Sequence, residues 1–140
     1  MRVAFASDDE NETTRAVVAA LADAGHEIIR PDAAESRPDL GRFVGRAVVD
    51  GRADYGVVMC WTGTGTAIAA NKVPGVRAAL AWDPWIAQGA RLWNDANVLA
   101  MSLKRLAPDV AVEVLRAFLD TPEPDPDEAG NIAAIEGGDR

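Results

Sequence analysis

Residues 55–72 read YGVVMCWTGTGTAIAANK, and this stretch decides how the chain folds. An apolar, strand-like run ends in Cys60, the only cysteine of the protein. Gly63 and Gly65 follow, and then an alanine-rich segment that is typical of a helix. A buried strand that passes through a glycine turn into a helix leaves backbone N–H groups free to bind an anion or oxyanion. The pattern therefore predicts a strand–turn–helix unit with a thiol beside an anion-binding turn.

Strand and helix signals alternate along the rest of the chain. Short apolar runs are typical of buried strands, and apolar residues three and four apart are typical of helices. The predicted strands are residues 3–6, 27–30, 55–59, 76–81 and 97–101, and the predicted helices are residues 13–24, 38–50, 63–71, 84–92 and 108–119. This order predicts an α/β fold of three layers, in which a five-stranded parallel sheet carries helices on both faces.

The composition is typical of a single globular domain. Of the 140 residues 49% are hydrophobic, and the net charge of −8 leaves no basic face for nucleic acid. No apolar run reaches the ~20 residues that span a membrane, and one cysteine allows no internal disulfide, as is usual in a reducing compartment. We expect a cytoplasmic protein in which residues 1–120 form one domain. Residues 121–140 form a proline-rich acidic tail, which either wraps the body or a partner subunit or is loose.

Four of the predicted strands end at residues 7–9, 60–62, 81–83 and 101–102. In parallel α/β sheets, ligands bind at the carboxyl ends of the strands. We therefore expect the functional site to lie among these residues.

Three motifs resemble the ribose-5-phosphate isomerase B family, which includes the galactose-6-phosphate isomerase subunits. They are Cys60 with Thr62, Gly63 and Gly65, the run AANKVPG at residues 69–75, and the run NDANVLA at residues 94–100. The resemblance covers roughly residues 1–120 and implies a Rossmann-like domain that uses no metal and no cofactor. It also implies a homodimer, or a tetramer of two dimers, whose active sites lie at the interface and bind a sugar.

The reaction that the resemblance implies interconverts an aldose and a ketose phosphate by proton transfer through a cis-enediolate. The resemblance assigns the catalytic base to Cys60. Thr62 is expected to help catalysis as a hydrogen-bond donor that lowers the pKa of Cys60. A thiol with an ordinary pKa of ~8.5 is a poor base at neutral pH unless its site lowers that pKa. The alternative is that Cys60 is a small buried apolar residue at the end of a strand.

Substrate binding is expected on both sides of this base. The backbone N–H groups of Gly63, Thr64 and Gly65 are expected to bind the enediolate oxygen, because donors of this kind stabilise developing negative charge. Asp8 and Asn94 match positions that the resemblance assigns to the site.

Other positions depart from the family pattern. Asp9 stands where a histidine helps to hold the phosphate, and Trp93 stands where a histidine opens the sugar ring. Residues 129–136 contain none of the arginines that bind phosphate in the family. A carboxylate beside a phosphate is unfavourable, so we expect a substrate other than ribose 5-phosphate. Without the ring-opening histidine, that substrate is either open-chain or served by another acid/base group, for which Asp9 is the candidate; Asp9 is equally suited to bind sugar hydroxyls.

Large aromatic side chains change the expected pocket. Trp61 replaces a small residue directly after Cys60, and both Trp61 and Trp93 match positions that line the site in the family. Indole faces stack on the C–H faces of sugars. Arg37 replaces a tyrosine, and Lys104 stands where an arginine is common. Such a flat-walled, less cationic pocket favours an uncharged or carboxylated polyol, whose carboxylate Arg37 and Lys104 would bind.

Three hypotheses remain open at this stage. The first is a divergent sugar isomerase that uses Cys60 as base on a substrate other than ribose 5-phosphate. The second is a related epimerase that uses the same proton transfer. The third is a catalytically silent member of the family that binds a ligand.

Overall fold

The computed structural model describes residues 1–32 and 37–137, except for the side chains of Arg37 and Pro38. Over these residues, five strands form one parallel sheet in the order β2-β1-β3-β5-β4. The strands are β1 (Arg2–Ser7), β2 (Glu27–Ile29), β3 (Tyr55–Cys60), β4 (Ala78–Leu80) and β5 (Val98–Ser102). The helices are α1 (Glu12–Asp23), α2 (Arg37–Val49), α3 (Thr64–Asn71), α4 (Pro84–Asn94), α5 (Pro108–Leu119) and α6 (Ala129–Ile135), with a short 3-10 helix, η1 (Pro126–Glu128).

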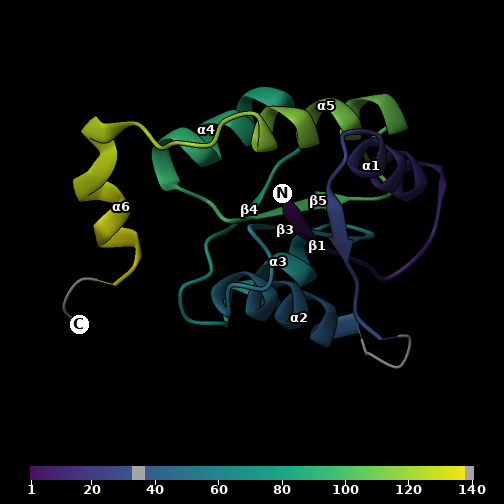
Figure 1. The fold of residues 1–140 in the computed structure, drawn as a ribbon, viewed down its shortest axis with the longest axis horizontal. Helices are drawn as coiled ribbons and strands as arrows, with labels where there is room; N and C mark the ends of the chain where they lie inside the picture. Colours follow the sequence, from purple (N-terminus) through teal and green to yellow (C-terminus); the bar gives the residue numbers. More distant parts are fainter. Residues whose placement is uncertain (33–36, 138–140) are drawn as a thin grey trace.

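The helices cover both faces of the sheet, which confirms the predicted α/β fold. Helices α1, α4 and α5 lie on one face and α2 and α3 on the other (Figure 1). Along β1 the side chains alternate between the two layers, so that Phe5 packs beneath the first group of helices and Ala4 and Ala6 beneath the second. None of the described helices is long and apolar enough to cross a bilayer.

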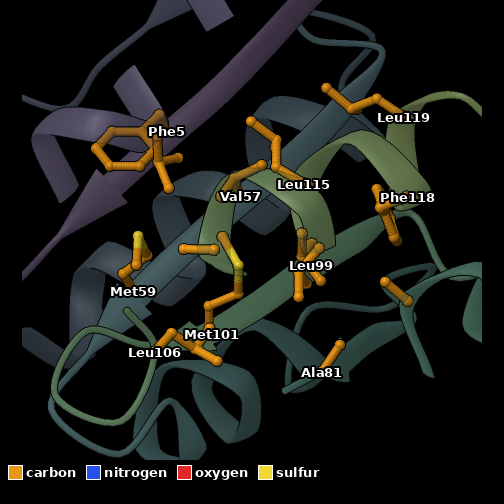
Figure 2. Close-up of a cluster of buried hydrophobic side chains, with 14 of the residues drawn as sticks. Phe5, Val57, Met59, Ala81, Leu99, Met101, Leu106, Leu115, Phe118 and Leu119 are labelled. Carbon is orange, nitrogen blue, oxygen red and sulfur yellow. The ribbon is translucent and has the colours of Figure 1, made fainter. Parts of the chain in front are cut away.

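The two layers differ in the size of their side chains. The cluster under α1, α4 and α5 holds the large ones, among them Met59, Met101 and Phe118 (Figure 2). Each such side chain contributes about 1.5–3 kcal/mol when it is fully buried. The cluster under α2 and α3 consists mostly of alanine and valine. This second layer lets the helices approach one another and the sheet closely.

Close packing against α2 places α3, the helix that follows Cys60. A Cβ atom on Gly41 of α2 would lie 2.5 Å from the carbonyl oxygen of Thr66 and 2.9 Å from the Cβ of Ala69. Only glycine allows this approach of the two backbones. The alanine-rich sequence of α3 is therefore a requirement of packing, and it holds the start of this helix at a fixed distance from the sheet.

The described segment directly after α5 lies against the body of the domain. The N–H of Asp125 donates to the carbonyl oxygen of Leu92 at 2.8 Å, and the Tyr55 hydroxyl donates to the carbonyl of Pro122 at 3.3 Å. Helix α6 then extends to one side of the sheet (Figure 1), and Glu136 at its end pairs with Arg77. The described part of the tail thus combines a proline-rich segment with a short final helix.

Element boundaries differ from the predicted ones by one or two residues. β4 is shorter than the predicted strand 76–81, because Val76 donates its N–H to Val73 in a turn and Arg77 donates its N–H to the Asn97 side chain. Helix α4 continues to Asn94, two residues beyond its predicted end. It ends there because Asp95 adopts a left-handed conformation with φ of 46°.

Candidate active site

A sharp turn joins the end of β3 to the start of α3, and we call residues 60–66 the Cys60 turn. Gly63 has φ of +80°, which residues with a side chain rarely adopt. A Cβ atom there would lie 2.9 Å from the carbonyl carbon of Met101 and 3.0 Å from the nitrogen of Ser102. The turn therefore presses directly on the backbone at the end of β5, and this contact requires glycine.

Several donors of the turn point at the sulfur of Cys60. The N–H of Gly63 donates to Cys60 Sγ at 3.1 Å, and the Thr66 hydroxyl donates to it at 3.4 Å. The Thr62 hydroxyl is more distant, at 4.0 Å. Burial raises the pKa of the Cys60 thiol, but the hydrogen bonds from Thr66, Gly63 and Thr62 outweigh burial, so this pKa lies below its ordinary value. The hydrogen bonds from the turn thus stabilise the thiolate form of Cys60 relative to an unperturbed thiol.

The N–H groups predicted to bind an oxyanion are thus divided between two tasks. Gly63 serves Cys60, and the N–H of Thr64 donates to the Thr62 hydroxyl at 3.3 Å, while these two threonine hydroxyls share a hydrogen bond of 2.7 Å. The N–H of Gly65 has no hydrogen-bond partner among the described residues, and a Cβ atom at Gly65 would meet open space. The turn holds the sulfur with one part of its backbone and leaves Gly65 for a ligand.

A second element supports the rim of the turn. Cys60 pairs with Ser102 in the ladder between β3 and β5, and the Ser102 hydroxyl donates to the Trp61 carbonyl at 2.6 Å. Trp61 is 45% exposed, and Lys104 Nζ lies 5.2 Å from the centre of its ring. Trp61 and Lys104, both predicted to bind substrate, therefore lie together beside Cys60.

The two aspartates after β1 lie at the same edge of the sheet. The N–H of Asp8 donates to the Met59 carbonyl at 3.2 Å, which places Asp8 beside the end of β3. Asp9 is exposed, and its carboxylate accepts a hydrogen bond from the N–H of Glu10 at 2.8 Å. Both predicted site residues are thus near the Cys60 turn, and Asp8 is the closer to β3.

Two other predicted residues lie elsewhere in this chain. Trp93 and Asn94 precede β5, at the amino edge of the sheet, whereas Cys60 lies at the carboxyl edge. The Trp93 ring covers Gly89 and meets Trp85 edge to face at 5.4 Å, and it is 39% exposed. Arg37 begins α2, but its side chain lies outside the described part of the structure.

The sequence analysis did not assign a role to Thr66 or Ser102. Each makes a hydrogen bond to the Cys60 turn, and each is buried, at 3% and 8% exposure. The spacing of Thr66 from Gly63 is a local signal, because a threonine hydroxyl near a helix start can bond the carbonyl three residues earlier. The Ser102 contact depends on sheet register and leaves no local signal. Among the described residues, no three His, Cys, Asp or Glu side chains gather as metal ligands would.

Fold and turn together define a class: parallel α/β domains that carry a hydrogen-bonded thiol at the carboxyl edge of the sheet. Within that class, the sequence matches the ribose/galactose isomerase family over residues 3–135. The chain therefore belongs to this family, as the three sequence motifs predicted.

Individual relatives agree with this assignment. D-erythrulose-4-phosphate isomerase of Pectobacterium atrosepticum is 41% identical over 83 residues, which cover 59% of this chain and 55% of the relative. Ribose-5-phosphate isomerase B of Escherichia coli is 36% identical over 107 residues, which cover 74% of this chain and 72% of the relative. The chain spans slightly more than half the length of the first curated relatives that it matches.

A solved structure extends the similarity to nearly the whole chain. Ribose-5-phosphate isomerase B of Clostridium thermocellum matches with a TM-score of 0.86 and 32% identity, over 97% of this chain and 95% of that one. The alignment therefore extends beyond residue 120 into the tail.

Proposed function

We propose that this protein is an aldose–ketose isomerase that uses Cys60 as its base, without a cofactor, on a short open-chain sugar phosphate. The observation that carries the proposal is the Cys60 sulfur, which Gly63 and Thr66 hold by hydrogen bonds at the carboxyl edge of the sheet. The hydrogen bonds outweigh burial and lower the pKa of Cys60 below its ordinary value, which increases the fraction of thiolate that can act as a base.

In the proposed reaction, the substrate and Cys60 together neither gain nor lose a proton. The Cys60 thiolate takes the proton from the carbon beside the carbonyl group, which leaves a cis-enediolate and a neutral thiol. The hydroxyl proton of the enediolate passes from one oxygen to the other, and the thiol returns the first proton to the neighbouring carbon. The carbonyl has then moved by one position, and the thiolate is restored. The N–H of Gly65 and the hydroxyl of Thr64 are the groups that we assign to the enediolate oxygen.

An open-chain substrate follows from the groups that the site lacks. Ring opening requires an acid or base at the ring oxygen, and the resemblance assigns it to a histidine where this chain has Trp93. The only histidine, His26, lies 3.4 Å from the terminal amine of Met1, away from the Cys60 turn. A four-carbon sugar with phosphate on its last oxygen has no hydroxyl left with which to close a five-membered ring. D-erythrulose 4-phosphate, the substrate in the name of the Pectobacterium relative, is such a compound. We assign its phosphate to Lys104 at the rim, in place of the carboxylate that the sequence predicted there.

The substrate proposal is tested by proton exchange in heavy water, followed by NMR. We expect solvent deuterium to enter D-erythrulose 4-phosphate about 10–100-fold faster than ribose 5-phosphate, because only the second needs a ring-opening group. Equal rates for both phosphates would contradict the open-chain argument. Equal rates for D-erythrulose with and without phosphate would remove Lys104 as a phosphate ligand. No exchange with any sugar would favour a member of the family that only binds its ligand.

We also propose that a second copy of the chain completes each active site. Trp93 and Asn94 lie at the amino edge of the sheet, so they can reach a Cys60 only across an interface. Trp85 and Trp93 expose 64% and 39% of their surface side by side on α4, and clustered exposed aromatic rings are typical of interfaces.

Mixed dimers test this shared site. We expect Cys60→Ser and Asn94→Ala each to lower exchange severely, and a mixture of the two, unfolded and refolded together, to recover about a quarter of wild-type activity. Recovery arises because each mixed dimer has one site with both residues intact. A protein that light scattering shows to be strictly monomeric, or a mixture without recovery, would contradict the proposal.

A further inference from the structure

Thr66 has a hydroxyl group that faces two acceptors. Its Oγ1 lies 3.4 Å from the sulfur of Cys60 and 3.4 Å from the carbonyl oxygen of Gly63. The side chain is 3% exposed, so water does not compete freely for it. A hydroxyl has one proton and can donate to one acceptor at a time. Two acceptors at the same distance therefore offer this proton two orientations.

We propose that Thr66 is a positioning residue that supports both protonation states of Cys60, and this inference rests on the proposed isomerase function. When Cys60 is a thiolate, the Thr66 hydroxyl donates to its sulfur. After Cys60 has taken the substrate proton, the hydroxyl turns its own proton to Gly63 and its oxygen accepts from the S–H group. Thr66 keeps its proton throughout, and every proton that is transferred belongs to the substrate.

The backbone around Thr66 is suited to this role. In a helix, threonine divides between two side-chain rotamers because its oxygen can bond a carbonyl three or four residues earlier, and Gly63 is three residues earlier. The close contact of Gly41 with the Thr66 carbonyl fixes the backbone from the other side. Only the hydroxyl proton needs to move between the two states.

Charged groups near Cys60 do not replace this contribution. Asp8 follows β1 and Lys104 follows β5 at this edge of the sheet, and α3 carries no charge before Lys72. The pKa of Cys60 is instead set by burial, which raises it, and by hydrogen bonds, of which the bond from the Thr66 hydroxyl lowers it most.

The test measures the sulfur directly, without any sugar. Because Cys60 is the only cysteine, the pH dependence of alkylation by iodoacetamide reports its thiolate. We expect Thr66→Val to move this profile to higher pH and to lower the alkylation rate at pH 7 about tenfold, since one pKa unit is a tenfold change in thiolate. Thr66→Ser keeps the hydroxyl and should follow the wild-type profile. If Thr66→Val does not fold, Thr66→Ala serves in its place.

Two outcomes would overturn the inference. One is a Thr66→Val profile that coincides with wild type, and the other is a Thr66→Ser profile that shifts as far as that of Thr66→Val. The pH profile of kcat/KM for D-erythrulose 4-phosphate should move in the same direction in Thr66→Val. A protein that turns over no sugar would refute the proposed function, whereas an unmoved alkylation profile would refute the role of Thr66.

Discussion

Replacing Cys60 by serine is expected to lower the rate of deuterium exchange by about 10²–10⁴-fold, the usual contribution of a general base. A serine hydroxyl fits the same space and accepts the same hydrogen bond from the N–H of Gly63, so the turn should keep its shape. Its proton is far harder to remove than that of a thiol, so almost no base is present near neutral pH. The Cys60→Ser variant should therefore lose deuterium exchange and keep its fold.

The pH dependence of the wild-type protein has a definite sign. Below its pKa Cys60 is a thiol and cannot take a proton, and above it the thiolate can, so exchange should rise with pH through this pKa. Hydrogen bonds from Thr66 and Gly63 place the rise at lower pH than for an unperturbed thiol. The rise should be missing from Cys60→Ser.

Thermal unfolding and alkylation provide the controls for Cys60→Ser. The variant should unfold within about 1 kcal/mol of wild type, as substitutions that keep a hydrogen bond usually do. Wild-type protein alkylated at Cys60 should lose exchange to the same extent as the variant. A Cys60→Ser protein that exchanges within tenfold of wild type would remove Cys60 as the base, and would direct attention to Asp9.

The fold could be predicted because its signals are local. Apolar runs and helical spacing identify each strand and helix of the sheet layers, and strict alternation of strand and helix permits few arrangements other than a parallel sheet. The exact ends of some strands and helices could not be predicted, because they depend on side chains that are distant in sequence. Asn97, twenty residues away, takes the N–H of Arg77 and so shortens β4. The sequence of α6 shows no apolar periodicity, so this helix was not predicted. The residue after it, Glu136, pairs with Arg77, which is 59 positions away.

The candidate site, like the fold, could be predicted only where its signals are local in the sequence. The turn after Cys60 could be predicted because a strand–glycine–helix pattern is local, whereas the contacts of Cys60 with Gly63 and Thr66 were not predicted, although they lie within seven residues. The sequence did not indicate that the turn directs the Gly63 N–H at its own sulfur. Under the proposed mechanism, the same turn that supplies N–H groups to a ligand also stabilises the Cys60 thiolate, which would account for the thiol and the glycine motif occurring together. Trp61 and Lys104 meet through the pairing of β3 with β5, which no local pattern encodes.

Arg91 shows most clearly what the sequence could not reveal. Helical spacing places Arg91 on the buried face of α4, four residues after Ala87, but an arginine is rarely buried, and the charge alone would predict a solvated side chain. Its side chain is nevertheless 3% exposed. The guanidinium group donates to Asp95 at 2.7 Å and to the carbonyls of Ala96, Thr121 and Pro122. Tail carbonyls come to cover α4 only once the whole chain has folded. Burial of Arg91 is therefore a consequence of the tertiary structure.

Replacing Arg91 by methionine is expected to lower the free energy of unfolding by about 3 kcal/mol, at the lower end of the cost of breaking a buried ion pair. Methionine fills the space but leaves the carbonyl of Ala96, which is 1% exposed, without this donor, and buried acceptors without partners are costly. Asp95 retains its second ion pair, with Arg77 at 3.1 Å, in the variant. The loss of stability should therefore stay at the lower end of the cost of breaking a buried ion pair.

Urea denaturation measures this loss against a matched surface variant. Arg2 pairs with Asp54 at 3.2 Å, but both side chains are more than 40% exposed, so Arg2→Met should cost less than about 1 kcal/mol. Because Arg91 joins the tail to the turn before β5, Arg91→Met should also make the tail more susceptible to proteolysis, and Arg2→Met should not. If both variants unfold at the same urea concentration as wild type, Arg91 does not fasten the tail. If they are destabilised equally, the loss reflects removal of positive charge from an acidic protein rather than the buried network.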